Sequence, residues 1–171
     1  AGKTTLLRML AGVDKPDTGE IEPGHGLKIG YFAQEHENLD VKKSVLETMQ
    51  ASAPQLNDTD CRKVLGSFLF SGDDVSKPAG VLSGGEKTRL ALAALVVSSA
   101  NVLLLDEPTN NLDPASREEI LRALASFTGA VVLVSHDVGA VEALNPERVL
   151  ILPDGVEDHW NQGYADLISL S

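Results

Sequence analysis

The sequence has 171 residues, of which 43% are hydrophobic, and its 25 acidic and 14 basic side chains give a formal net charge of −11. This is the size of one domain with a buried core. No apolar run reaches the roughly 18 residues that span a bilayer, and no secretory signal opens the chain. We therefore expect a cytosolic, and hence cytoplasmic, protein without a transmembrane segment, and the single Cys61 excludes an internal disulfide.

The charge pattern also bears on nucleic acids. No run of Lys or Arg exceeds two residues, whereas a broad nucleic-acid-binding surface needs a basic stripe. Direct nucleic-acid contact by this part of the molecule is therefore disfavoured, and any such contact would rest on small local basic pairs.

The first five residues, Ala-Gly-Lys-Thr-Thr, match the second half of the phosphate loop G-x-x-x-x-G-K-[ST]. The candidate phosphate-binding residues are Gly2, Lys3, Thr4 and Thr5. Leucines at helical spacing follow, and Gly12 is a stop signal for that helix. Because the first glycine of the loop and its preceding strand are not in the sequence, we expect a fragment that begins inside its own nucleotide site.

Short strands are expected around residues 20–21 and 27–32, separated by a Pro-Gly-His-Gly turn. The second strand ends near Gln34. A polar amide at this point is a candidate for a role at a metal ion and at an attacking water.

Residues 41–80 change character and are expected to form a small helical insertion. Ser44 and Glu47 have the spacing of a capping box that opens one helix. Residues 61–68 carry apolar side chains at the i, i+3, i+4, i+7 spacing of a second helix.

Residues 82–86, Leu-Ser-Gly-Gly-Glu, precede a long apolar stretch. Ser83 supplies a hydroxyl, and Gly84 and Gly85 let backbone N–H groups approach an anion without a Cβ in the way. These groups are expected at a helix N-terminus, which is the favoured place for a phosphate.

From residue 101 strands and helices alternate. Buried strands are expected at 102–105 and 130–134, with an N-cap at Asp113 between them, and a further strand at 148–152 precedes an Asp-Gly turn. The pattern predicts an α/β fold, with a mainly parallel sheet core and an inserted helical subdomain. In this interpretation 1–171 is a single domain, with 1–34 and 100–171 as core and about 40–98 as the helical subdomain.

The polar residues at strand ends fit phosphoryl transfer to water, which needs neutralised phosphate oxygens, a held Mg²⁺ and an oriented water. Lys3 would bridge the β and γ phosphates. The candidate metal residues are Thr4, Gln34 and Asp106. Adjacent residues at a strand end point in different directions, so Glu107 can face the water as general base while Asp106 faces the metal.

His136 follows the next buried strand and could hydrogen-bond the γ-phosphate and position the water. The remaining histidines, His25, His36 and His159, lack such a placement and receive no role. The predicted catalytic residues are therefore Glu107, His136 and Gln34.

With these residues the chain resembles the nucleotide-binding domain of ATP-binding cassette (ABC) proteins. The matching motifs are a truncated Walker A at 2–5, the Q-loop Gln34, the signature at 82–86, Walker B at 102–107, the D-loop at 110–113 and the switch His136. The resemblance implies a P-loop NTPase fold and ATP hydrolysis with Mg²⁺. It also implies a second ABC cassette packed head to tail, so that Ser83 and Gly85 touch the partner's nucleotide, and it adds Asp113 to the nucleotide-binding residues.

Within that family, two segments look like the ABC-F branch. They are Glu-Lys-Thr-Arg-Leu-Ala-Leu-Ala after the signature glycines and Glu-Pro-Thr-Asn-Asn-Leu-Asp at 107–113. Asn111 and Val138 depart from the usual ABC-F residues, which are His and Arg. The resemblance implies the C-terminal cassette of a protein with its other cassette upstream in the same chain, acting on the ribosome in translation or antibiotic protection. The alternative is the ATP-hydrolysing subunit of a membrane ABC transporter.

Overall fold

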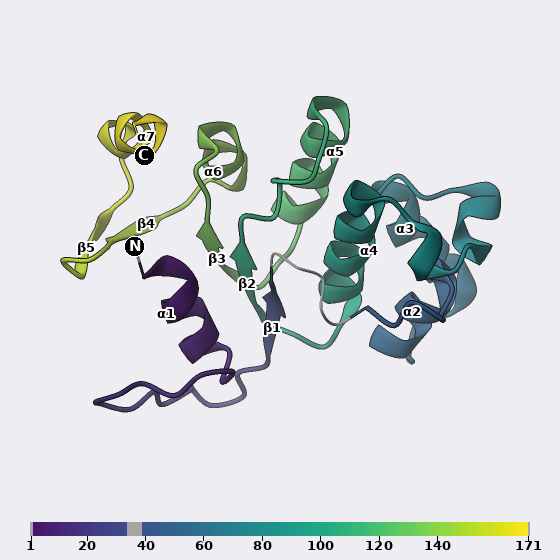
Figure 1. Ribbon diagram of the computed structural model, residues 1–171, viewed down its shortest axis with the longest axis horizontal. Helices are drawn as coiled ribbons and strands as arrows, with labels where there is room; N and C mark the ends of the chain where they lie inside the picture. Colours follow the sequence, from purple (N-terminus) through teal and green to yellow (C-terminus); the bar gives the residue numbers. More distant parts are fainter. Residues whose placement is uncertain (1, 34–38, 171) are drawn as a thin grey trace.

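The computed structural model describes residues 2–33 and 39–170 (Figure 1). At its centre lies a parallel sheet of three strands in the order β1-β2-β3. These strands are β1 (Ile29–Phe32), β2 (Val102–Asp106) and β3 (Ala130–Val134). Because neighbouring strands run parallel, their carboxyl ends meet at one edge of the sheet.

Several helices lie along this sheet and toward one end of the molecule (Figure 1). They are α1 (Lys3–Leu10), α5 (Pro114–Ala125), α6 (Val138–Leu144) and α7 (Gln162–Ser169). An antiparallel hairpin of β4 (Arg148–Ile151) and β5 (Val156–His159) precedes α7. Asp113 is the N-cap of α5 and Pro114 its first residue, as the sequence predicts.

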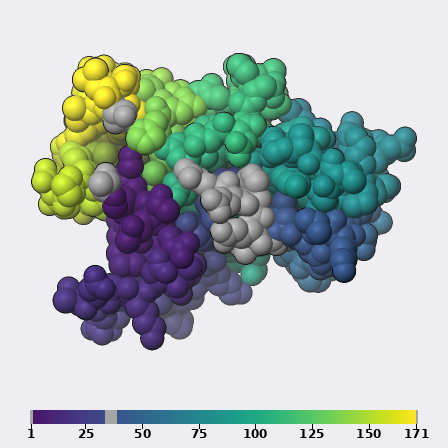
Figure 2. Space-filling view, in the orientation of Figure 1, coloured from purple at the N-terminus to yellow at the C-terminus, as the bar shows by residue number. Residues whose placement is uncertain are grey.

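The predicted helical insertion is confirmed as a group of helices at the other end of the molecule, coloured blue to teal in Figure 2. It consists of α2 (Val45–Ser52), α3 (Asp58–Ser67), α4 (Gly84–Val97) and the short 3₁₀ helices η1 (Gly72–Ser76) and η2 (Ala79–Val81). The predicted capping box of Ser44 and Glu47 opens α2, and Cys61 and Leu65 are the buried residues of α3. Within the described part of the chain, no helix is both long and apolar enough to cross a membrane.

The core forms where α4 and α5 pack around β2. Leu103 and Leu105 of β2 are fully buried, and so are Leu90 of α4 and Ile120 of α5. Gly30 of β1 permits this close packing, because a Cβ there would lie 3.1 Å from the side chains of Leu95 and Ala100.

The predicted strand around residues 20–21 is wrong. These residues and their neighbours are exposed and form no strand, because Gly19 and Pro23 flank a segment that has no partner strand. The strand predicted at 27–32 begins only at Ile29. Ahead of it, the Asn101 side chain accepts a hydrogen bond from the Lys28 amide at 2.8 Å in place of a main-chain partner.

The strand predicted at 130–134 is present as β3, but the prediction that it is buried is wrong. Its residues are exposed or half-buried, and Val132 is 41% exposed. The physical reason is that β3 is the edge strand of the described sheet. A groove of about 810 Å³, lined by residues of α1, β3 and β4, runs along its outer edge.

The contrast between central and edge strands leads to a stability prediction. Leu103→Ala removes a fully buried side chain and should lower the free energy of unfolding by about 2–5 kcal/mol, through lost burial and a residual cavity. Val132→Ala, at the edge strand, should cost about 1 kcal/mol or less. Urea midpoints at unchanged m-value measure both. Equal losses for the two variants would contradict the assignment of β2 as the centre of the core.

Candidate nucleotide site

The candidate site lies at the carboxyl edge of the parallel sheet, where three segments meet. β2 ends in Asp106 and continues into Glu107, while β3 is followed by Ser135 and then His136. The first turn of α1 brings Lys3 and Thr4 to the same edge. Five of the residues predicted from the sequence are therefore joined by direct contacts.

Thr4 and Asp106 form the innermost contact of the site. The Thr4 hydroxyl donates to Asp106 Oδ2 at 2.8 Å. Asp106 is 1% exposed, and its Oδ1 is a buried oxygen without a hydrogen-bond partner among the described residues. An unsatisfied buried carboxylate oxygen is costly in free energy. This position therefore fits a bound group that donates a hydrogen bond to Oδ1 or a cation that Oδ1 coordinates.

The donor set at Thr4 and Asp106 is that of a hard divalent cation. Mg²⁺ takes oxygen ligands, keeps several waters and is typically held by one or two protein oxygens together with substrate phosphates. The described residues contain no group of three or more His, Cys, Asp or Glu side chains that could hold a metal ion alone. Thr4 and Asp106 therefore fit a cation shared with a phosphate better than an all-protein metal cage.

Glu107 turns away from the line of β2. Its φ of 48° is in the left-handed region, which costs about 1–3 kcal/mol for a residue with a side chain and is typical of functional sites. The Glu107 amide donates to Val134 O at 2.8 Å, which fixes this turn against β3. The side chain is 7% exposed, and its Oε1 is a second buried oxygen without a hydrogen-bond partner among the described residues.

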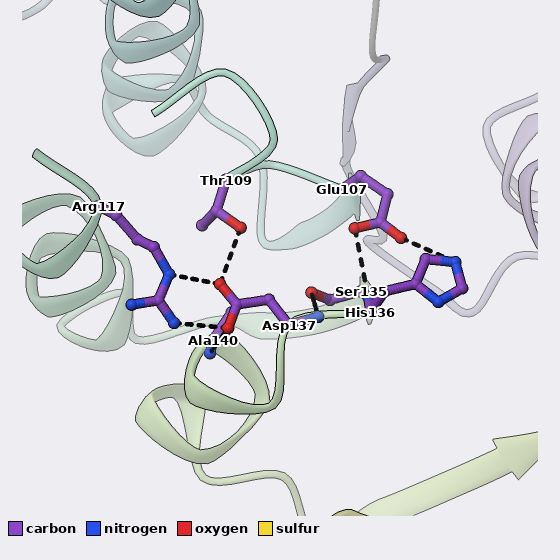
Figure 3. A network of polar contacts seen from close by, with 7 residues as sticks. All are labelled: Glu107, Thr109, Arg117, Ser135, His136, Asp137 and Ala140. Carbon is purple, nitrogen blue, oxygen red and sulfur yellow. Dashed lines mark hydrogen bonds and ion pairs between the residues drawn. The ribbon is translucent and has the colours of Figure 1, made fainter. Parts of the chain in front are cut away.

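His136 faces Glu107 from the neighbouring strand end (Figure 3). The His136 amide donates to Glu107 Oε2 at 3.3 Å, and its ring Nε2 lies 3.4 Å from Glu107 Oε1. The same Nε2 lies 3.3 Å from the Lys3 ammonium. The ammonium requires a lone pair on Nε2 and the carboxylate requires a proton there, so the two contacts belong to alternative states of the ring.

The signature residues lie at the N-terminus of α4, as predicted. Ser83 is the N-cap, and its hydroxyl accepts from the Glu86 amide at 3.2 Å while Glu86 accepts from the Ser83 amide at 3.0 Å. This capping box orients the first turn of the helix. The hydrogen bond from the Ser83 amide also lowers the pKa of Glu86.

Gly85 approaches the D-loop closely. A Cβ on Gly85 would lie 2.9 Å from the backbone oxygen of Asn111, whereas a Cβ on Gly84 would meet nothing within 4 Å. The second glycine of the signature is therefore required by packing within this chain. That requirement exists in addition to any access it gives to an anion.

The other predicted site residues have fewer contacts in the structure. Gly2 is the N-cap of α1 with a φ of 89°, which suits glycine, and Thr5 is exposed in the first turn of α1. Asp113 is the exposed N-cap of α5. Gln34 lies outside the described residues.

Sequence reasoning missed a polar network beside the site (Figure 3). Asp137 accepts from both Nε and Nη2 of Arg117 on α5 and from the Thr109 hydroxyl at 3.3 Å. The Arg117 hydrogen bonds hold the pKa of Asp137 below its ordinary value, and they raise the pKa of Arg117. The available signal was the acidic residue directly after His136 at a helix start, but Arg117 had no distinguishing pattern.

Comparison with known proteins identifies the family. Residues 1–110, which are more than half of the chain, match the family model described as ABC transporter. The chain belongs to the ABC ATPase family. The resemblance and the fold class inferred from its motifs are confirmed.

Relatives of the cassette share its sequence over most of its length. It is 49% identical over 136 residues to the putative ATP-binding protein YdiF of Bacillus subtilis, covering 80% of the cassette and 21% of YdiF. It is 40% identical over 140 residues to the energy-dependent translational throttle protein EttA of Mycobacterium tuberculosis, covering 80% and 25%. The cassette thus spans about a fifth to a quarter of these relatives, and EttA is an ABC-F protein.

A solved structure supports the fold. The cassette superposes on the dimeric structure of MJ0796, a bacterial ABC transporter cassette, with a TM-score of 0.76 over 94% of this chain and 81% of the other. The two sequences are 24% identical, so this likeness establishes the fold alone.

The close approach of Gly85 to Asn111 gives a prediction with a matched control. Gly85→Ala should lower the free energy of unfolding by about 1–3 kcal/mol, because the new Cβ forces the start of α4 away from the D-loop. Gly84→Ala, one residue away with open space around it, should leave stability equal or slightly raised. Urea unfolding of the two variants decides the matter, and a Gly85→Ala variant as stable as Gly84→Ala would exclude the packing role.

The lowered pKa of Asp137 predicts an acid-dependent contribution to stability. The unfolded carboxyl, with a pKa near 3.8, binds protons more readily than the folded one, so the stabilisation is fully present above that pH and is lost as pH falls through the folded pKa. Asp137→Asn should therefore be less stable than the wild type at pH 6, with a difference that shrinks toward pH 3. Asp154→Asn, in the exposed β4–β5 turn, is the control and should show no such convergence.

Proposed function

We propose that this cassette binds and hydrolyses ATP as part of an ABC-F type protein that acts on the ribosome, in translation regulation or antibiotic protection, in the cytoplasm. The observation that carries the catalytic part is the end of β2. There Asp106 bonds to Thr4 at 2.8 Å, and the next residue, Glu107, contacts His136. One strand end thus presents a metal-type carboxylate and a second, separately oriented carboxylate.

In this proposal Gly2, Lys3, Thr4 and Thr5 hold the phosphates. Their position at the start of α1 supports this, because the first amides of a helix have no partners within the helix and favour an anion. Lys3 adds a charge at the β and γ phosphates. Thr4, Asp106 and Gln34 would hold Mg²⁺, which when bound neutralises phosphate oxygens during transfer.

Glu107 is proposed as the general base. Its buried Oε1 has no hydrogen-bond partner among the described residues and lies 3.4 Å from His136 Nε2, and it would accept a proton from an oriented water. His136 would orient that water and the γ-phosphate through Nε2. Once a phosphate pairs with the Lys3 ammonium, His136 Nε2 no longer has to accept a hydrogen bond from Lys3. It can then carry a proton and donate a hydrogen bond instead.

Ser83, Gly84, Gly85 and Asp113 are proposed to serve a nucleotide held by a second cassette, upstream in the same chain. This division is supported by the start of α4, where the capping box orders the first turn and the residues Ser83 and Gly84 are exposed. The dimeric assembly of MJ0796 is consistent with it. In this view 40–98 is the helical subdomain that presents the signature, and 1–34 with 100–171 is the core of a single domain.

The ribosomal role is proposed from the relatives. EttA is named for translational throttling, and its 40% identity exceeds the 24% identity with the transporter cassette MJ0796. The acidic balance of this part of the molecule disfavours a broad RNA surface, so RNA contact would lie mainly elsewhere in the chain.

The test uses the full natural chain that carries this cassette. Glu107→Gln should lower kcat for ATP hydrolysis about 100-fold or more, because the general base is lost, while ATP binding persists. The variant should retain ATP with the two cassettes packed together, and it should co-sediment with ribosomes more than the wild type does. Steady-state phosphate release and ribosome pelleting with and without ATP are the measurements.

Glu22→Gln is the matched control, since Glu22 is an exposed carboxylate outside the site, and it should behave as the wild type. Hydrolysis by Glu107→Gln at the wild-type rate would contradict the role of Glu107. Ribosome pelleting that does not depend on ATP would contradict the ribosomal function, and association with a membrane-spanning partner instead would favour the transporter subunit.

A further inference from the structure

The network around Asp137 connects three segments that are distant in sequence (Figure 3). Asp137 directly follows His136 and caps α6, where its Oδ1 accepts from the Ala140 amide at 3.3 Å. Arg117 reaches it from α5, and Thr109 reaches it from the loop that begins with Glu107.

We propose that Arg117 is a positioning residue for ATP hydrolysis, which acts through Asp137 to hold His136 against Glu107. This inference rests on the proposed hydrolytic role of Glu107 and His136. It assigns a function to Arg117 of α5, whose side chain donates to Asp137.

The geometry of the Arg117–Asp137 pair supports a positioning role. The guanidinium offers two donors to the two oxygens of one carboxylate, one of them at 2.5 Å, and a bidentate fork fixes direction as well as distance. The side chains are 31% and 27% exposed, so solvent competes less than it does at an open surface pair.

The backbone around the pair is fitted to it. A Cβ at Gly139 would lie 2.3 Å from Arg117 Nη2, so a larger residue here would require the guanidinium to shift from its present position beside Asp137. The Asp137 amide donates to Ser135 Oγ at 3.0 Å, which closes the turn that carries His136.

Fixing the Asp137 carboxylate constrains both His136 and the loop after Glu107, through nearby residues of the chain. The Asp137 carboxylate is fixed by Arg117, the next residue toward β3 is His136, and its amide bonds to Glu107 Oε2 at 3.3 Å. Thr109 ties the same carboxylate to the loop that follows Glu107. Loss of Arg117 would therefore loosen both strand ends together, and a displacement of about 1 Å in such a site can cost about 100-fold in rate.

The test compares Arg117→Gln with Arg122→Gln in the full natural chain. Arg122 lies on the same helix and forms an exposed ion pair with Glu119 at 2.7 Å, and Asp137 is not its partner. Arg122→Gln therefore controls for the loss of one positive charge from α5. Arg117→Lys, which keeps the charge but loses the fork, measures partial rescue.

Three quantities are measured for each variant: kcat for ATP hydrolysis, the Kd of a fluorescent ATP analogue, and hydrogen exchange of the amides at 135–137. Arg117→Gln should lower kcat about 10- to 100-fold with Kd within about twofold, and it should speed amide exchange at 135–137. Arg117→Lys should lie between Arg117→Gln and the wild type, and Arg122→Gln should match the wild type. A purely structural ion pair would not separate kcat from Kd in this way.

Unchanged kcat, or unchanged exchange at 135–137, in Arg117→Gln would overturn the proposal. If that variant does not fold, Thr109→Val, which removes one donor to Asp137 and keeps the side-chain volume, must show the same separation of kcat from Kd. Amide exchange requires no turnover, so it still tests whether Arg117 holds the turn at 135–137 if the wild type hydrolyses no ATP. A slow Glu107→Gln beside a fully active Arg117→Gln would overturn this inference alone and leave the proposed function standing.

Discussion

The parallel pairing of β2 between β1 and β3 is the constraint on which the site depends. Parallel strands end at a common edge, so Asp106 at the end of β2 and His136 just after β3 are neighbours although 30 residues apart in sequence. Pairing of Asp106 with Val134 sets the register, and the Glu107 amide extends it by bonding to Val134 O at 2.8 Å. A shift of one residue would separate Glu107 from His136.

Much of this arrangement could be predicted from the sequence, because its signals are local. The run of leucines before Asp106 predicts a buried central strand, and Ser83 followed by Glu86 predicts a helix start. These signals depend on chemistry within a few residues of the chain, and the structure contains both features.

What the sequence could not provide depends on partners that are distant in the chain. The valines of β3 are equally apolar, yet β3 is an edge strand beside a groove, and burial at an edge is decided by a neighbour and not by composition. Arg117 has the spacing of any exposed helical arginine, and only the tertiary approach of α5 to the turn after β3 reveals its bonds to Asp137. The left-handed φ of Glu107 likewise follows from its bond to β3.

The signature shows how one element can be held from two sides. At its start, α4 approaches the D-loop through Gly85 and Asn111. One turn later, Arg89 donates to the backbone oxygens of Phe68 and Leu69 at 3.3 and 3.1 Å and stacks over the Phe70 ring, which fixes the same helix to the end of α3. The orientation of the first turn of α4 therefore depends on both the strand end at Glu107, through the D-loop, and the helical insertion. A movement of either one reaches the signature through rigid backbone contacts, because neither Gly85 nor the carbonyl of Asn111 has side-chain freedom to absorb it.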